Sequence, residues 1–227
     1  MKLITNIAPI LTLIIVLVIA LFFIECNQKQ KNHKSAQENN LFVPGSTLLF
    51  NGETLNSWKI TQFGPQGPVN VSEGRIILGM GDGCTGITWK KDFPRINYEV
   101  SLEAMIITGN DFFCGITFPI HNDYCSLIVG GWGGAVVGLS TIDGVDASEN
   151  NTSIIRSFNE KEWYRIKLRV TEKEIEAWIN DEQVVDFTYE GKKLSIRPEV
   201  ELSIPFGITS WQTTAALRNI YLKEQSY

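Results

Sequence analysis

Apolar and polar side chains alternate one by one along residues 98–106. Tyr98, Val100 and Leu102 share one face with the apolar residues that follow, while Glu99 and its polar neighbours take the other. Because successive side chains of a β-strand point to opposite faces, this pattern predicts a strand with one dry face. The same pattern returns over residues 164–170 and 175–179, and shorter strand-like runs cover 75–78, 112–118, 124–129, 135–141, 200–211 and 215–222.

Strands that are dry on one face must pair two sheets face to face. No amphipathic helical pattern competes with them after residue 41, and residues 41–227 fit within a single all-β domain. The sequence therefore predicts an all-β, two-sheet jelly-roll sandwich over 41–227. Residues 180–181, Asn-Asp, are expected to form a hairpin turn, and Pro205 is expected to mark an edge or a bulge in its strand.

An uncharged apolar segment covers residues 7–24 near the N-terminus. At about 1.5 Å per residue it reaches roughly 27 Å, close to the thickness of the hydrocarbon core of a bilayer. We therefore expect residues 1–26 to form a membrane anchor or signal segment, with lipidation at Cys26 as the alternative to an uncleaved anchor. Residues 27–40 are polar and predict a flexible tether, so the domain is expected to be membrane-anchored and extracytoplasmic, in the periplasm or at the cell surface.

Charge and cysteine content exclude several classes of partner and cofactor. The net charge of -5 offers no basic surface for phosphate backbones, so nucleic acid is not an expected partner. The four cysteines show no Cys-x-x-Cys spacing, and neither a metal nor a cofactor is predicted. Cys114 and Cys125 are expected on successive strands as diagonal neighbours about 7–8 Å apart, beyond comfortable disulfide reach.

Four stretches of the chain resemble a known family. They are Leu-Phe-Asn-Gly at 49–52 with Leu55 and Trp58, Glu-Trp-Tyr-Arg-Ile at 162–166, residues 175–181, and residues 217–223. Together they resemble the 3-keto-disaccharide hydrolase domain family over roughly residues 48–224. The resemblance implies a concanavalin A-like lectin/glucanase jelly roll with laminin-G-like paired strands. It also implies an exported bacterial protein that cleaves or eliminates glycosides oxidised at C3 of the sugar.

Cleavage beside a 3-keto group needs a base for the acidified C2 proton and an acid for the leaving oxygen. Asp143 and Asp146 lie close in sequence, and Asp123 and His121 belong to a loop expected nearby. These four residues are the candidate catalytic groups. Solvated loop acids are the alternative interpretation, and the spacing of the aspartates does not match a calcium loop.

Aromatic and polar residues of the same region are the candidate substrate-binding groups. Trp132 stands between glycine pairs, which either leave its ring open for a sugar or form a tight bend that tucks it into the sandwich. Trp211 is out of phase with the apolar residues before it and is expected to point away from the core. Tyr124, Gln212 and Glu149 complete the predicted set.

Two functions follow from these features. The first is an enzyme that cleaves or eliminates 3-keto-glycosides, and the second is a non-catalytic carbohydrate-binding module. The second is motivated by a departure from the family: no Tyr-Glu step follows residues 109–111, Gly-Asn-Asp, and residues 124–126 read Tyr-Cys-Ser instead.

Overall fold

The alternating runs form the strands that their patterns predict. The computed structural model describes residues 44–225, and the predicted membrane segment and tether lie outside the described residues. In β11 (Trp163–Val170) every second side chain is buried, and β11 pairs antiparallel with β6 (Tyr98–Gly109). Ile166 lies opposite Leu102 in this pair, so the two apolar faces coincide. The alternation thus becomes one dry surface shared by neighbouring strands.

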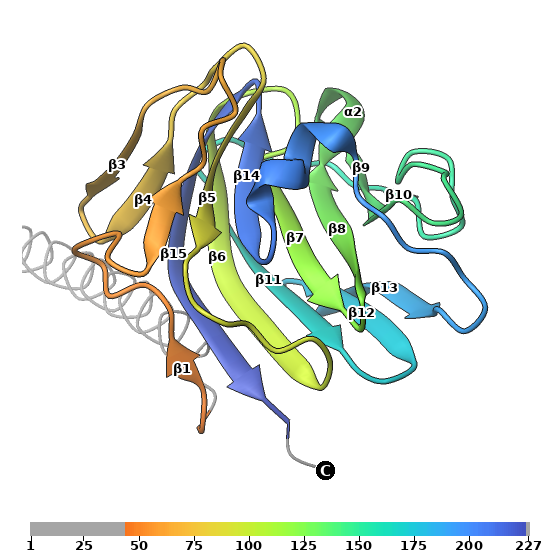
Figure 1. Ribbon diagram of the computed structural model, residues 1–227. Helices are drawn as coiled ribbons and strands as arrows, with labels where there is room; N and C mark the ends of the chain where they lie inside the picture. The colour runs from red at the N-terminus through yellow and green to blue at the C-terminus, as the bar shows by residue number, and fades with distance from the viewer. Residues whose placement is uncertain (1–43, 226–227) are drawn as a thin grey trace, which may run out of the picture. The chain divides into compact units, whose positions relative to one another are not determined.

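Two antiparallel sheets form the domain and lie one over the other (Figure 1). Sheet A has the order β13 (Glu182–Thr188), β12 (Glu174–Ile179), β11, β6, β15 (Thr213–Glu224), β4 (Arg75–Leu78) and β3 (Val69–Ser72), with β1 (Thr47–Leu48) also paired to β15. Sheet B has the order β10 (Ile154–Ile155), β9 (Val136–Ser140), β8 (Asp123–Gly130), β7 (Cys114–Ile120), β14 (Gly207–Trp211), β5 (Cys84–Trp89) and β2 (Trp58–Ile60). This is the predicted all-β two-sheet antiparallel sandwich, and it is consistent with a jelly roll.

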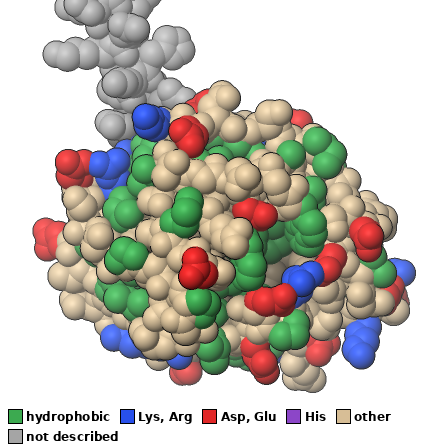
Figure 2. Space-filling model, turned by 90° about the horizontal axis from the view of Figure 1, so that it is seen from above, with side chains coloured by type: hydrophobic (Ala, Val, Ile, Leu, Met, Phe, Trp, Pro, Cys, Tyr) green, Lys and Arg blue, Asp and Glu red, His purple; other side chains and the backbone are tan. Residues whose placement is uncertain are grey.

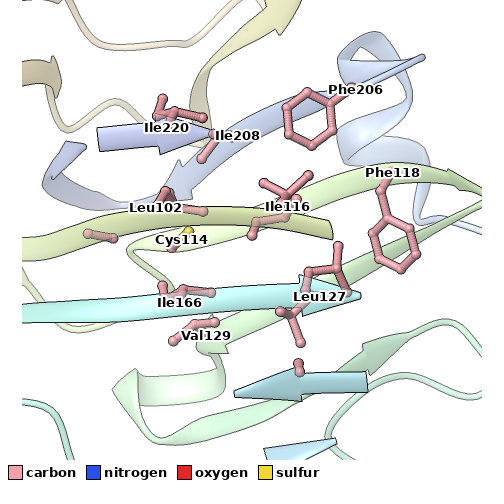
Figure 3. Close-up of a cluster of buried hydrophobic side chains, with 14 of the residues drawn as sticks. Leu102, Cys114, Ile116, Phe118, Leu127, Val129, Ile166, Phe206, Ile208 and Ile220 are labelled. Atoms are coloured by element: carbon pink, nitrogen blue, oxygen red, sulfur yellow. The ribbon is translucent and has the colours of Figure 1, made fainter. Parts of the chain in front are cut away.

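The hydrophobic core fills the space between the two sheets. Leu102 and Ile166 from sheet A meet Ile116, Leu127 and Phe206 from the sheet B side, and all five are fully buried (Figure 3). Because the inward positions of sheet B are apolar, its outward positions are free to carry other chemistry. Most of those outward positions are small or polar along β5, β14, β7, β8 and β9, with Ile128 and Trp211 among the exceptions, and some of them form the floor of the candidate site.

Short turns with left-handed backbone close two hairpins. Asn180 and Asp181 join β12 to β13 with φ of 51° and 71°, as a two-residue turn requires and as the sequence predicts. His121 and Asn122 join β7 to β8, with φ of 47° at His121. This turn sets Ile116 opposite Leu127, so Cys114 faces Val129 rather than a position near Cys125. Both cysteines are free thiols buried in the core.

The sequence prediction is wrong for the first part of residues 200–211. Pro198–Ser203 form a 3-10 helix, η1, and strand β14 begins only at Gly207. Pro198 opens this helix and Pro205 separates it from the strand, so the alternation of Val200 and Leu202 does not continue into the sheet. Residues 194–203, which we call the strap, instead cross the outer face of sheet B (Figure 1).

Several contacts fasten the strap to sheet B. The backbone of Ser195 exchanges two hydrogen bonds with Thr141, and the Thr88 hydroxyl donates to the carbonyl of Leu202 at 3.2 Å. Gly207 permits the closest approach, because a Cβ there would lie 2.7 Å from the Cβ of Ser203. The strap therefore forms a fixed wall on this face.

Helices contribute little to the rest of the described chain. None of the helices formed by residues 44–225 has the length and apolar character that a bilayer crossing needs. Beside η1, one short helical segment, α2 (Gly131–Gly134), follows β8.

Candidate functional site

A cavity of about 200 Å³ opens on the outer face of sheet B, between the strap and α2. Its lining combines three aromatic residues, three ionisable side chains at the wall, and small residues on the floor. These residues are Cys84, Asp111, Phe112, Ser126, Ile128, Trp132, Ser140, Arg197, Glu199, Val200 and Trp211. Figure 2 views the molecule from above, and on this face hydrophobic and acidic side chains lie side by side in the middle while most basic ones lie toward the edge.

Trp132 forms one wall of the cavity. Its backbone is left-handed, with φ of 48° and ψ of 58°, and its side chain is 42% exposed. Gly130 and Gly133 on either side also have positive φ, which only glycine adopts at little cost. The glycine pairs thus hold the indole open, so the open interpretation of this bend holds rather than the tucked one.

Trp211 lies at the end of β14 and faces outward, as the sequence predicts. Its backbone N–H donates to the carbonyl of Phe112 at 2.9 Å, which ties the end of β14 to the loop before β7. The side chain is half-buried against the cavity. Two indoles and the ring of Phe112 therefore line one hollow, which is the type of surface on which sugar rings stack.

Asp111 brings a carboxylate to the same hollow. Its Oδ1 accepts the N–H of Phe112 at 2.7 Å, and its Oδ2 accepts the N–H of Gly133 at 3.5 Å. Asp111 thus helps to position the turn that carries Trp132. Within residues 44–225, no lysine or arginine forms an ion pair with this carboxylate.

Arg197 of the strap joins two acidic side chains at the opposite wall. Its Nη2 donates to Glu199 Oε1 at 2.8 Å and its Nε to Glu199 Oε2 at 3.3 Å, while its Nη1 pairs with Asp146. Ser140, on the cavity floor, donates to Asp146 Oδ1 at 3.1 Å. The hydrogen bond from Arg197 holds the pKa of Glu199 below its usual value, and Glu199 in turn raises the pKa of Arg197.

The floor of the cavity carries no activated nucleophile. Burial, with a smaller contribution from the Glu199 carboxylate, raises the pKa of the Cys84 thiol to about 12. The thiol is therefore neutral at physiological pH and unreactive. Ser126 shares a hydrogen bond of 3.1 Å with Thr117, its neighbour on β7.

The structure does not bring the four predicted catalytic residues together. Asp143 accepts hydrogen bonds from the backbone of Lys193 and the ammonium of Lys192, which lower the pKa of its carboxyl. Asp146 pairs with Arg197 behind the cavity wall. The turn at Asp143, with φ of 53°, directs the first aspartate to the lysines and away from the second.

Asp123 and His121 lie at the β7–β8 hairpin, away from the cavity. Asp123 lines a second hollow of about 360 Å³ on the other side of the strap, together with Tyr124. His121 is exposed, and its Nε2 lies 3.0 Å from the hydroxyl of Tyr189.

Of the five predicted substrate-binding residues, the structure places Trp132 and Trp211 in the cavity. Gln212 directly follows Trp211 but is exposed outside the lining. Glu149 is also exposed, and its N–H donates to the carbonyl of Asp146 at 3.0 Å.

Sequence reasoning missed Asp111, Arg197 and Glu199. Asp111 follows the end of β6, and the sequence analysis names it only within residues 109–111, where the chain departs from the family. Arg197 and Glu199 lie just before the strand that the sequence predicts over 200–211, and the sequence assigns them no role. As to metal sites, residues 44–225 contain no group of three or more His, Cys, Asp or Glu side chains arranged to hold an ion.

Acid is expected to weaken the contribution of the Arg197–Glu199 pair to stability. A carboxyl whose pKa is lowered on folding stabilises the protein fully at pH values above its pKa in the unfolded chain, which is near 4.5 for a glutamate. This stabilisation is lost as the pH falls through the lower pKa of the folded protein. The free energies of unfolding of the wild type and of Glu199→Gln should therefore differ by up to about 1 kcal/mol at neutral pH, because the pair is partly exposed. The difference should shrink below about pH 4.5 in urea titrations.

The matched control for this titration is Glu53→Gln, which changes an exposed glutamate outside the cavity. Its difference from the wild type should stay near zero throughout. A gap between the wild type and Glu199→Gln that grows on acidification would contradict the assignment.

Comparison with known proteins places the whole described domain in one family. The model of the 3-keto-alpha-glucoside-1,2-lyase-like domain matches residues 45–223. The chain belongs to this family. The sequence resemblance stated above is confirmed, whereas the likeness to laminin-G-like sandwiches stays a prediction. No curated protein sequence matches the chain.

Solved structures similar to this lyase-like domain share its fold at low identity. A putative glycosyl hydrolase from Parabacteroides distasonis ATCC 8503 is 16% identical, with a TM-score of 0.53 over 80% of this chain and 95% of that one. The Crh5 transglycosylase in complex with NAG is 14% identical, with a TM-score of 0.56 over 81% and 85%. The metal-free carbohydrate recognition domain of Emp46p is 11% identical, with a TM-score of 0.50 over 76% and 90%.

Proposed function

We propose that this lyase-like domain binds a glycoside in the cavity on sheet B and cleaves glycosides that carry a 3-keto group. The observation that carries the proposal is the convergence of Trp132, Trp211 and the unpaired carboxylate of Asp111 on one cavity. Membership of the family supports the 3-keto substrate. The names of the similar structures, a putative glycosyl hydrolase, a transglycosylase and a carbohydrate recognition domain, support a carbohydrate ligand.

Elimination beside a 3-keto group fits the chemistry of these side chains. The aromatic walls hold the sugar ring, and the Asp111 carboxylate takes the proton from C2, which the neighbouring carbonyl acidifies. The electron pair of that C–H bond forms a double bond between C1 and C2, and the bond from C1 to the leaving oxygen breaks. The leaving oxygen takes a proton from water, and the hydroxide so formed takes the proton held by Asp111, which restores the carboxylate.

The same proposal includes the location of the domain. The apolar segment 7–24 would anchor the chain in a membrane, and the polar residues 27–40 would give the domain reach on the extracytoplasmic side. Glycosides outside the cytoplasm would then have direct access to the cavity.

The activity is tested by incubating the full-length protein, in a detergent without a sugar headgroup, with a glucoside of a coloured alcohol and with its 3-keto derivative. Release of the alcohol from the 3-keto compound above the enzyme-free rate, with none from the unoxidised glucoside, is the expected result. Equal release with and without protein would defeat the proposed activity.

Truncation of Trp132 is expected to weaken glycoside binding. Stacking of aromatic surfaces contributes roughly 0.5–1.5 kcal/mol beyond the buried area, so Trp132→Ala should raise the dissociation constant about tenfold. Isothermal titration with the unoxidised glucoside measures this without turnover. The fold should persist, because the indole is exposed.

Trp178→Ala is the matched control for that titration. Trp178 lies on sheet A, where Lys167 and Arg169 stack on its ring, and it lies outside the cavity. Its removal should leave the dissociation constant unchanged. Loss of affinity in Trp178→Ala, with full affinity in Trp132→Ala, would move the binding site to the other sheet.

A non-catalytic carbohydrate-binding module is the second candidate function. It is favoured by one observation: Arg197 engages both Asp146 and Glu199, so among residues 44–225 Asp111 is the one cavity carboxylate that no lysine or arginine pairs with. A base and an acid together would normally be expected for cleavage. Binding of glycosides by a wild-type protein that releases no alcohol would favour this candidate.

A further inference from the structure

We propose that the cavity selects sugars by charge, preferring amino sugars with a free ammonium group to neutral sugars and disfavouring carboxylated or sulfated ones. This inference rests on the proposed function, since it concerns the same cavity. It adds a ligand class that neither the family nor the fold assigns.

The first observation is that each nitrogen of the cavity's cation already donates a hydrogen bond to a carboxylate. Arg197 is the one lysine or arginine among the described lining residues. Its three donor nitrogens all bond to carboxylates, two bonds to Glu199 and one to Asp146. An arginine that recognises an acidic ligand usually offers its paired donors to the ligand itself. Here the paired donors Nε and Nη2 already bond to Glu199, two positions away in the sequence.

The second observation is the excess of negative charge around the hollow. Asp111 and Glu199 line it, and Asp146 pairs with Arg197 behind the wall, so three carboxylates in or beside the hollow are set against one guanidinium. Low-dielectric walls strengthen the field inside a cleft lined by one sign of charge. An anionic sugar would meet this field without a free cation to bind it.

The third observation is the pairing of a carboxylate with aromatic faces. Asp111 positions the turn of Trp132, and Trp211 lines the same hollow. Aromatic faces attract cations through their quadrupole, and an ammonium in this hollow gains the carboxylate as well. A protonated amine on the sugar therefore finds both kinds of partner, whereas a hydroxyl finds one.

Titration with three matched ligands tests the inference without any turnover. The full-length protein is titrated at about pH 6 with the methyl glycosides of glucosamine, glucose and glucuronic acid, the amine of the first being protonated there. We expect the glucosaminide to bind about tenfold more tightly than the glucoside, and the glucuronide more weakly than either. The preference should fall at high salt, which screens charge but not stacking.

Two variants make the result specific to the named side chains. Asp111→Asn keeps the acceptor for the Phe112 N–H but removes the charge, so glucosaminide and glucoside should bind nearly alike. Glu199→Gln removes a negative charge and one of the two oxygens that accept from Arg197, so affinity for the glucuronide should rise relative to the glucoside. This gain cannot arise from partial unfolding. Asp186→Asn, an exposed aspartate on β13 of sheet A, makes the same change in net charge and should alter none of the three.

The outcomes separate this inference from the proposed function. Equal affinities of the wild type for all three ligands, or an unchanged preference in Asp111→Asn, overturn the charge selection and leave the cavity as a glycoside site. Failure of all three ligands to bind overturns both. Tighter binding of the glucuronide by the wild type also overturns the inference.

Discussion

Turnover of a 3-keto-glycoside is expected to fall by about 10²–10⁴ when Asp111 is replaced by asparagine, because a positioned general base contributes about that much to a rate. The asparagine still accepts the backbone N–H of Phe112, so the turn that carries Trp132 should keep its place. The loss should therefore lie in kcat, with KM for the neutral substrate little changed. Initial rates of alcohol release over a range of substrate concentrations measure both.

Asp143→Asn is the matched control for Asp111→Asn. Asp143 is bound to Lys192 and Lys193 outside the cavity, so we expect its rate to stay within about twofold of the wild type. Full turnover in Asp111→Asn with loss of turnover in Asp143→Asn would return catalysis to Asp143, one of the catalytic residues that the sequence predicts.

Phe206→Ala is expected to cost about 3–5 kcal/mol of unfolding free energy, the usual range for a buried phenylalanine. The Phe206 ring is fully buried and stacks on Phe93 with ring centroids 4.1 Å apart. It also lies 5.8 Å from the ring of Trp58, so its loss opens a cavity between residues that cannot collapse freely. Chemical denaturation monitored by far-UV circular dichroism measures the change.

Leu202→Ala is the control for this measurement. Leu202 is four residues away, in the strap, and its side chain is 54% exposed. Its truncation should change stability by no more than about 0.5 kcal/mol. If the two variants were equally destabilised, or if Phe206→Ala cost under about 1 kcal/mol, the two-sheet core described here would be wrong at this position.

The fold could be predicted from the sequence because alternation is a local property of each strand. Tyr98, Val100 and Leu102 alternate with polar residues whatever their partners are, and burying that face against β11 and a second sheet follows from the pattern alone. The strap could not be predicted in the same way. Val200 and Leu202 continue the spacing of a strand, and only the two prolines that flank them give a local signal against it.

The candidate site was predictable only in part, for a related reason. Trp132 stands out because glycines flank it, and Trp211 because it breaks the phase of its strand. No local sequence feature distinguishes Asp111 and Arg197. Each comes to line the cavity only because the loop before β7 and the strap meet over sheet B. Asp143 and Asp146 are close in sequence, yet the turn between them gives each a different basic partner.

The central claim is that a glycoside binds between Trp132 and Trp211, and the indole N–H signals of the six tryptophans test it most directly. Each signal of the full-length protein can be assigned from single Trp→Phe variants and followed by ¹⁵N-resolved NMR during titration with a glycoside. We expect the signals of Trp132 and Trp211 to shift together and to saturate with one dissociation constant, while those of Trp163 and Trp178 on sheet A stay in place. Saturable shifts of Trp163 and Trp178, with Trp132 and Trp211 unmoved, would contradict the claim.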